Sequence, residues 1–206
     1  FTGIYNTGAV ITALNINNNK IGDNIAGAVT YSQQHSSVIA GINCPTVTNT
    51  AAVSISGNNF QGFTQTLAGT SVQEHKYISL VHAVAGATTD NINNNTFTNL
   101  VANTGGNVTF ISRTGTMASL AGATDNCNNN SIVGSFSKPV SGGVVTIYTA
   151  TTPSLTGNTM NQTGNNFSNI TLTGATTMSG WNNIEGSTSS EGPVKNISNN
   201  IFSNWT

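Results

Sequence analysis

Charged side chains are scarce in this chain. Five Lys plus Arg and six Asp plus Glu make up 5% of the 206 residues, whereas an average soluble domain carries roughly 25%. With a net charge of -1 and no basic run, the chain lacks the clustered Lys and Arg that neutralise phosphates, which argues against a nucleic-acid partner. Solubility must therefore come from Asn, Thr, Ser and Gly.

Long apolar runs and helix-forming stretches are also missing. No segment reaches the roughly 18 consecutive apolar residues of a membrane helix, so no helical membrane span is expected. Asn and Gly at this density oppose helix, because they compete for backbone hydrogen bonds or add backbone entropy. Since 36% of the residues are apolar, the chain can still bury a core, and strands and turns must build it.

Cysteine is scarce as well, with two in the chain. Cys127 falls in a column otherwise held by isoleucine, apart from Gln162; the isoleucines are Ile16, Ile55, Ile92 and Ile197. We therefore expect a buried small hydrophobic side chain at Cys127. A disulfide between Cys127 and Cys44 is the alternative that the spacing leaves open.

Catalytic and metal-binding motifs are absent from the sequence. It has no phosphate loop, His-x-x-His pattern, Gly-x-Ser-x-Gly elbow or CxxC pair. With six acidic residues in total, we expect neither an enzyme nor a cofactor.

What the chain does have is a repeat. At six places an Asn stands two residues before a large apolar anchor, and a Gly or Asn stands immediately before that Asn. The Asn residues are Asn19, Asn58, Asn95, Asn130, Asn165 and Asn200, and the anchors are Ile21, Phe60, Phe97, Ile132, Phe167 and Phe202. The last four anchors follow one another at 35-residue intervals, and the earlier steps are 39 and 37 residues. A period of this size indicates units that bury their apolar faces by stacking on their neighbours.

Each unit is expected to be strand, tight turn, strand. The Gly or Asn column suits a turn residue with positive φ, because these two types tolerate the left-handed region best. If the units stack at strand spacing, about 4.8 Å, the Asn column that follows forms a ladder of amides hydrogen-bonded along the stack. Further strands are expected after Gly105-Gly106 and Gly142-Gly143, and from Lys76 to Val81.

The run Ile92-Asn93-Asn94-Asn95-Thr96-Phe97 resembles the right-handed parallel β-helix repeats of the pectin-lyase-like superfamily. Phe97-Thr98-Asn99 followed by Gly105-Gly106 also looks like the passenger repeats of chlamydial polymorphic outer-membrane proteins and large bacterial adhesins, although here the Gly-Gly pairs precede Asn-Val or Val-Val and not Ala-Ile. The resemblance covers essentially the whole chain. It implies an all-β, right-handed parallel β-helix with about 35-residue coils, and it leaves the function open because this solenoid hosts both enzymes and stalks.

We expect residues 1–206 to form a single solenoid segment that is cut in mid-repeat at both ends. Phe1-Thr2-Gly3-Ile4 reads like Phe97-Thr98-Asn99-Leu100, and the chain stops near the same point of the repeat, at Trp205. A propeller or sandwich is the competing architecture, but neither needs an Asn in every unit. Low-complexity disorder conflicts with the regular apolar columns.

The repeat puts two acidic residues at equivalent positions of adjacent coils. Asp90 and Asp125 are 35 residues apart, so adjacent coils should bring them within about 5 Å of each other. Such a pair would raise one pKa or attract a cation such as Ca²⁺. Two Asp residues that cap equivalent turns are the simpler interpretation, since the flanking units offer Val53 and Met160 at this position.

A second group of titratable residues is Glu74-His75-Lys76, with His82 six residues later. Alternating side chains on a strand could bring a His and an acid together for acid–base chemistry, but a solvated loop that enters a strand explains the group more simply. Arg113 has no motif around it.

These features favour a non-catalytic structural or adhesive segment of an extracellular or cell-surface protein, or of a filament. The expected partners are copies stacked end to end or the rest of a longer repeat chain, with glycans or a host surface as further candidates. The first alternative is a polysaccharide-active β-helix enzyme, which should show charged residues converging on one concave face. The second is an ice-binding solenoid, suggested by Thr114 and Thr116 repeating as Thr149 and Thr151.

Overall fold

The computed structural model describes residues 1–32, 37–48, 50–66, 73–84, 86–115, 122–151, 156–183 and 192–206. Over these residues the chain forms nineteen β-strands and no helix. No helix in this part of the chain is therefore long and apolar enough to cross a membrane.

The strands form three parallel sheets. Sheet 1 consists, in order, of β1 (Thr2–Tyr5), β5 (Ile39–Val47), β9 (His75–His82), β12 (Val108–Thr114), β15 (Val144–Ala150) and β18 (Thr177–Asn183). Sheet 2 consists of β2 (Ala13–Asn17), β6 (Ala52–Ser56), β10 (Thr89–Asn91), β13 (Thr124–Asn126), β16 (Thr159–Thr163) and β19 (Val194–Ser198). Sheet 3 consists of β3 (Lys20–Gly22), β7 (Asn59–Gln61), β11 (Thr96–Val101), β14 (Ser131–Lys138) and β17 (Ile170–Leu172), and beside it β4 (Val29–Tyr31) pairs with β8 (Phe63–Gln65).

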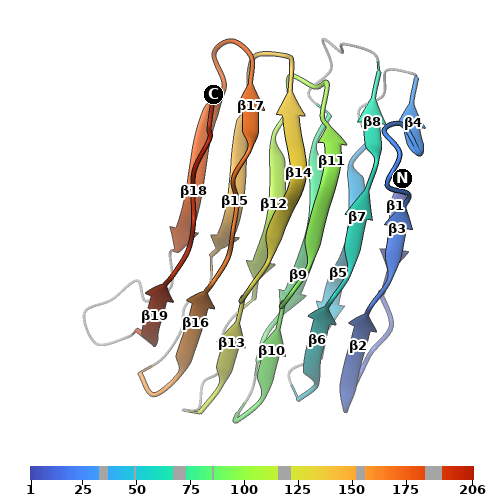
Figure 1. Ribbon diagram of the computed structural model, residues 1–206. Coiled ribbons are helices and arrows are strands. Elements are labelled where there is room, and N and C mark those ends of the chain that lie inside the picture. The colour runs from blue at the N-terminus through green and yellow to red at the C-terminus, as the bar shows by residue number, and fades with distance from the viewer. Residues whose placement is uncertain are drawn as a thin grey trace.

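The chain visits the sheets in turn, so that β9, β10 and β11 make one coil and β12, β13 and β14 make the next (Figure 1). This is a parallel β-solenoid with stacked coils, as the repeat predicted. In sheet 2 and at the anchors of sheet 3, the step is 35 residues from β10 and β11 onward, as in the pairing of Asp90 with Asp125 and of Phe97 with Ile132. In the two earlier coils the step is 39 and then 37 residues.

Sheet 1 departs from that step. Its partners are separated by 33 residues between His75 and Val108 and by 37 between Val108 and Val145. The predicted alignment of Thr114 with Thr149 is therefore wrong, because Thr149 pairs with Ser112. Thr116 lies outside the described residues. The threonine rank that suggested ice binding is not formed as predicted.

The turn between sheets 2 and 3 is the most regular feature of the coil. All six residues of the Gly or Asn column have positive φ, with φ from 55° to 67°: Asn18, Gly57, Asn94, Asn129, Gly164 and Asn199. This confirms the prediction from residue type. A second positive-φ column follows the last five anchors at Gly62, Asn99, Gly134, Asn169 and Asn204, where the same steric argument applies.

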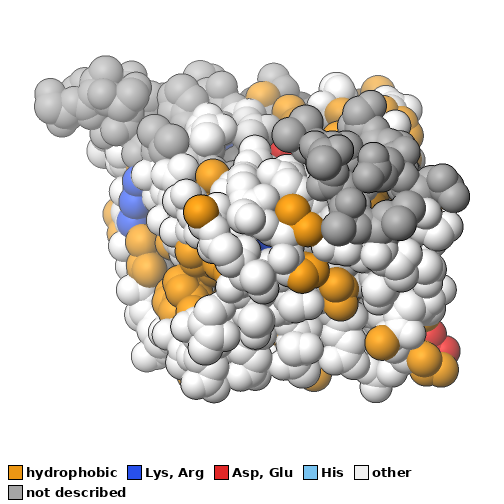
Figure 2. Space-filling model, turned by 90° about the horizontal axis from the view of Figure 1, so that it is seen from above, with side chains coloured by type: hydrophobic (Ala, Val, Ile, Leu, Met, Phe, Trp, Pro, Cys, Tyr) orange, Lys and Arg blue, Asp and Glu red, His pale blue; other side chains and the backbone are white. Residues whose placement is uncertain are grey.

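The outer surface is largely uncharged. In the view of Figure 2 most of the described surface is neither charged nor hydrophobic, and hydrophobic side chains gather toward the left, the side on which Figure 1 has β18 and β19. The exposed hydrophobic residues of the last coil are Val194, Ile197, Ile201, Phe202 and Trp205.

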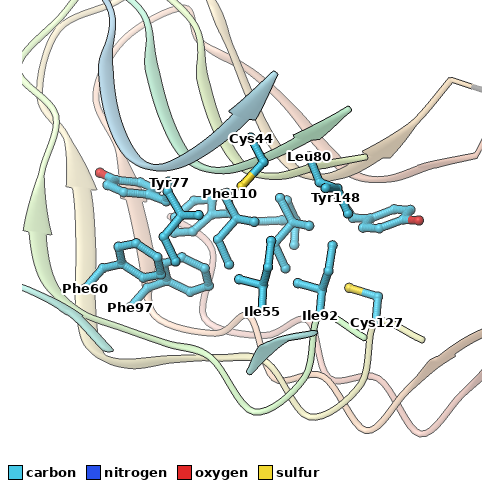
Figure 3. Packing of buried hydrophobic residues seen from close by; sticks show 14 of the residues in the cluster. Cys44, Ile55, Phe60, Tyr77, Leu80, Ile92, Phe97, Phe110, Cys127 and Tyr148 are labelled. Atoms are coloured by element: carbon cyan, nitrogen blue, oxygen red, sulfur yellow. The ribbon is translucent and has the colours of Figure 1, made fainter. Parts of the chain in front are cut away.

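The core consists of stacked columns between the three sheets. Phe60 and Phe97 pair directly and stack with ring centroids 5.2 Å apart, and the anchors from Phe60 to Phe167 are buried. Figure 3 shows Ile55, Ile92 and Cys127 standing in one row, as the column alignment predicted. Such apolar packing is the main source of stability in a solenoid, because each coil buries its neighbour.

Both cysteines are buried free thiols, so the described structure has no disulfide between them. Burial raises the pKa of Cys44 to about 11. Burial, and then the charge of Asp125, raises the pKa of Cys127 well above its usual value. Both side chains act as small hydrophobic groups.

Candidate functional site

The six ladder asparagines form a continuous hydrogen-bonded row through the interior. Asn95 illustrates the pattern: its backbone N–H and its Nδ2 donate to Asn130 Oδ1 at 3.0 and 2.9 Å, and Nδ2 also donates to the Ile55 carbonyl at 2.8 Å. The Asn95 carbonyl accepts from the backbone N–H of Ser131. The four interior ladder residues Asn58, Asn95, Asn130 and Asn165 are fully buried. The predicted ladder is confirmed, and it links every coil to the next.

The ladder leaves the amides of its interior members well paired. Asn130 Oδ1 accepts two hydrogen bonds from Asn95, and Asn130 Nδ2 donates to the Ile92 carbonyl and to Asn165 Oδ1. Neither Ser nor Gly offers this combination of donors and acceptor. A buried amide without such partners is costly, which explains why Asn recurs in every coil.

A second Asn row, which sequence reasoning missed, runs along the outer face of sheet 2. Asn126 Nδ2 donates to Asn91 Oδ1 at 2.9 Å, Asn161 Nδ2 to Asn126 Oδ1 at 2.8 Å, and Asn196 Nδ2 to Asn161 Oδ1 at 2.8 Å. Its signal was present, because these four residues are 35 apart. The many other Asn residues in the chain concealed it.

The interior between sheets 1 and 2 holds a cluster of charged and polar side chains, which we call the charge cluster. Its members are His82, Asp90, Arg113, Asp125 and Tyr148. Asp90 and Asp125 point inward from β10 and β13, and Arg113 comes from β12. All are at most 1% exposed. The two carboxylates are therefore adjacent, as predicted, but they do not cap exposed turns.

Arg113 links the two carboxylates. Its Nη2 donates to Asp90 Oδ2 at 2.9 Å, its Nη1 donates to the Gly115 carbonyl at 2.6 Å, and its Nε lies 3.7 Å from Asp125 Oδ2. The guanidinium thus occupies the place where the sequence hypothesis put a cation. Among the described residues there is no group of three His, Cys, Asp or Glu that could hold a metal ion.

His82 is the second side chain, after Arg113, that contacts the buried carboxylate of Asp90. Its Nδ1 lies 2.8 and 3.0 Å from the two Asp90 carboxylate oxygens, and its Nε2 lies 2.9 Å from the Thr48 carbonyl oxygen. A carbonyl oxygen only accepts hydrogen bonds, so Nε2 must carry a hydrogen. Nδ1 faces the Asp90 carboxylate, so both ring nitrogens of His82 lie against oxygen atoms.

The carboxylate of Asp125 has fewer and longer polar contacts than that of Asp90. It accepts from the Tyr148 hydroxyl at 3.3 Å, and Arg113 Nε is too distant for a hydrogen bond. Burial raises the pKa of Asp125 to about 6, although Arg113 opposes the shift; nearby Asp90 adds to it. For Arg113, burial lowers the pKa, but the carboxylates of Asp125 and Asp90 outweigh this effect and hold it above its usual value.

The second predicted group, Glu74, His75, Lys76 and His82, is divided between surface and interior. Glu74 and Lys76 form a half-exposed ion pair at 3.1 Å. His75 is buried with its Nε2 2.8 Å from Gln65 Oε1. His82 belongs to the charge cluster, so the expectation of a solvated loop was wrong for both histidines.

Lys138 is a further buried cation that the sequence did not indicate. Its Nζ donates to the carbonyls of Val140 and Gly142, both at 2.6 Å, and burial lowers its pKa. It holds the turn that leads into β15. Near this corner a depression of about 320 Å³ is lined by Glu74, Gly105, Gly106, Asn107 and Gly143. Glu74 is the one carboxylate among these lining residues.

Comparison with known proteins assigns no family to this solenoid. No protein-family model matches the chain, and no match is found among curated proteins or solved structures. The resemblance to pectin-lyase-like and adhesin repeats therefore stays a prediction, whereas the parallel β-solenoid rests on the geometry.

Proposed function

We propose that this chain is a non-catalytic structural or adhesive β-solenoid element of an extracellular surface protein or filament. Its buried asparagines and its charge cluster join coils, and its outer faces offer amides and hydroxyls. The observation that carries the proposal is the placement of the charges.

Nine of the eleven charged side chains lie in the described residues. Four of these nine, Asp90, Arg113, Asp125 and Lys138, are buried. Four more form two surface pairs, Lys20 with Asp23 and Glu74 with Lys76. A glycoside hydrolase needs two accessible carboxylates about 5 to 9.5 Å apart, and the described surface places its acids singly, each beside a lysine. This supports a structural role over the polysaccharide-active alternative.

The interior supports the same proposal. The ladder and the anchor column repeat without interruption from the first coil to the last, so the coils form one continuous stack. In a solenoid each coil depends on its neighbours, which suits a stalk that keeps a fixed length and cross-section.

A polysaccharide panel tests the catalytic alternative. The purified chain is incubated with neutral and acidic polysaccharides, and new reducing ends and unsaturated products are measured beside a Glu74→Gln variant. We expect no product above the blank. Turnover that Glu74→Gln abolishes would replace our proposal by the enzyme.

The proposed location is tested on the cells that make the protein. Antibodies against the folded chain should label intact cells in immuno-electron microscopy, because a surface element is accessible without permeabilisation. Labelling that requires permeabilisation would contradict an extracellular role and leave the solenoid without its proposed site of action.

A further inference from the structure

The outer face of sheet 2 carries a regular array of uncharged polar side chains. Along β10, β13 and β16, which lie side by side (Figure 1), inward-pointing buried residues alternate with outward-pointing, partly exposed ones. The outward residues form three rows, which we call the sheet 2 grid: Thr89, Thr124 and Thr159; Asn91, Asn126 and Asn161; and Asn93, Asn128 and Thr163. None of these nine side chains is charged, aromatic or aliphatic.

The grid is regular in two directions. Thr89 pairs with Thr124, and Thr124 pairs with Thr159, without a register shift. Neighbouring strands lie about 4.8 Å apart, and alternate residues along one strand lie about 6.6 Å apart. Hydroxyl and amide groups therefore repeat at these two spacings over three interior coils, and the grid does not involve the first or the last coil.

Hydrogen bonds between coils hold the side chains of the grid in place. Asn126 and Asn161 each donate from Nδ2 to Oδ1 of the Asn in the preceding coil. Asn93 Oδ1 accepts from the backbone N–H of Asn128 at 2.8 Å, and Asn128 Oδ1 accepts from the backbone N–H and the hydroxyl of Thr163 at 2.9 and 3.1 Å. An amide nitrogen carries two hydrogens, and the bond along the row uses one of them. Groups that are already fixed lose little conformational entropy when they bind.

The outer faces of the other two sheets are less regular. Sheet 1 presents Lys76 and the exposed Val81, and its step between paired residues varies from 33 to 38. Sheet 3 presents the exposed Val133, and its register shifts after Thr98. In sheet 2 the two acids of β10 and β13 point into the core, so they add no charge to the grid.

We infer that the sheet 2 grid is an ice-binding face, which holds the crystal through its hydroxyl and amide groups. The surface of ice is flat and uncharged, and its water oxygens repeat in two directions at spacings close to those of the grid. Water held between the protein and the crystal can bridge the remaining mismatch, because bridged hydrogen bonds are nearly as favourable as direct ones.

A polysaccharide matches the grid less well. A sugar chain repeats in one direction only, and its rings present apolar C–H faces that bind best against aromatic side chains, which the grid lacks. The ice-binding inference rests on the proposed adhesive function and names the surface that is bound. It uses sheet 2, and not Thr114 and Thr149 of sheet 1.

Partition into a slowly growing ice crystal tests the face. The purified chain is frozen from dilute solution together with serum albumin, which does not bind ice, and both proteins are measured in the ice and in the remaining liquid. Wild type should be concentrated in the ice. Thr124→Tyr places a bulky ring in the middle coil of the grid and holds the crystal away from its neighbours, so this variant should stay in the liquid with albumin. Thr149→Tyr makes the same change on the outer face of sheet 1 and should enter the ice like wild type.

Controls separate ice binding from misfolding and from binding to sugars. Circular dichroism establishes whether each variant is folded, and Thr159→Tyr repeats the test at a second grid position if Thr124→Tyr is not. Exclusion of wild type from ice overturns the inference, as does entry of folded Thr124→Tyr or exclusion of folded Thr149→Tyr. The same proteins are incubated with insoluble cellulose and chitin. Binding there that Thr124→Tyr removes, together with exclusion of wild type from ice, assigns the grid to glycans instead. Exclusion from ice leaves the structural function standing, because the polysaccharide assay and the surface labelling test it separately.

Discussion

The Asn ladder and the charge cluster bury polar groups in the same coils by opposite means. The ladder uses one neutral residue type in every coil, and each of its four interior members makes the same bonds at the turn between sheets 2 and 3. The charge cluster uses five residues of four types from five strands, and it occurs once in the described part of the chain, between sheets 1 and 2. A repeated neutral row tolerates the loss of one member better than a single set of ions, because an uncompensated buried charge costs more than an unpaired amide.

The largest effect is expected from Arg113→Met. This change leaves Asp90 and Asp125 buried without their shared cation, which should cost about 3 to 5 kcal/mol in the free energy of unfolding, measured by urea denaturation. Lys20→Met, which removes an exposed partner of Asp23, should cost far less, because water solvates the charge that is left.

Neutralising the acids checks the cause of that loss. Arg113→Met combined with Asp90→Asn and Asp125→Asn removes both buried negative charges and should recover part of the stability. If the single variant loses less than about 1 kcal/mol, the cluster does not depend on its cation as argued.

The next effect is on the pH dependence of stability. The pKa of Asp125 is raised from 3.8 to about 6, first by burial, so between these values the folded state binds more protons than the unfolded state. The contribution of Asp125 is therefore fully present below about pH 4 and is lost as the pH rises through 6. Relative to Asp125→Asn, wild type should lose up to about 3 kcal/mol over this range, since one pKa unit corresponds to about 1.4 kcal/mol.

The comparison with Asp125→Asn cancels the groups that both proteins share. Asp90, His82, Arg113 and Tyr148 face Asp125 in the cluster, and they remain in the variant. Urea midpoints at several pH values between 4 and 7 measure the difference. A difference that is constant with pH, or that grows in favour of wild type as pH rises, contradicts the raised pKa.

The contrast between the repeated Asn ladder and the single charge cluster explains what the sequence could predict. The ladder, the anchor column and the positive-φ turn all repeat at a fixed step, so one alignment of the units places every member. Asp90 opposite Asp125 follows from the same step. Repetition supplied the evidence for each of these predictions, and the physical chemistry of Asn and Gly supplied the reason.

Arg113 and His82 could not be placed in this way. Each lies on sheet 1, where the step between paired residues varies from 33 to 38, and neither recurs at the paired position of another coil. Because Arg113 has no equivalent at a fixed interval, aligning the repeat units gives no partner for it. Its contact with Asp90 depends on the length of chain between sheets 1 and 2. The sequence therefore predicted the two acids and missed the groups that compensate them.

A smaller effect is expected from Asn130→Ala in the ladder. It removes the acceptor for Asn95 and the donor to the Ile92 carbonyl, leaving buried groups unpaired at a cost of about 1 to 3 kcal/mol. Asn200→Ala, at the last rung, removes the same kind of residue where water can replace its bonds, and should cost less. Equal losses at the two positions would show that burial does not set the value of a ladder residue.

The smallest effect is expected from Asn126→Ala, in the outer row. Asn126 lies in the same coil as Asn130 and takes part in the outer row of four asparagines, with Nδ2 donating to Asn91 Oδ1 and Oδ1 accepting from Asn161 Nδ2. Its side chain is on the outer face of sheet 2, so water can satisfy the neighbours that the substitution leaves behind. The free energy of unfolding should change by no more than about 0.5 kcal/mol, measured beside Asn130→Ala by urea denaturation. A loss as large as that of Asn130→Ala would mean that the hydrogen-bonded row itself, inside or outside, holds the coils together. A negligible loss assigns that role to the buried ladder, whose amides also pair with backbone groups that water does not reach.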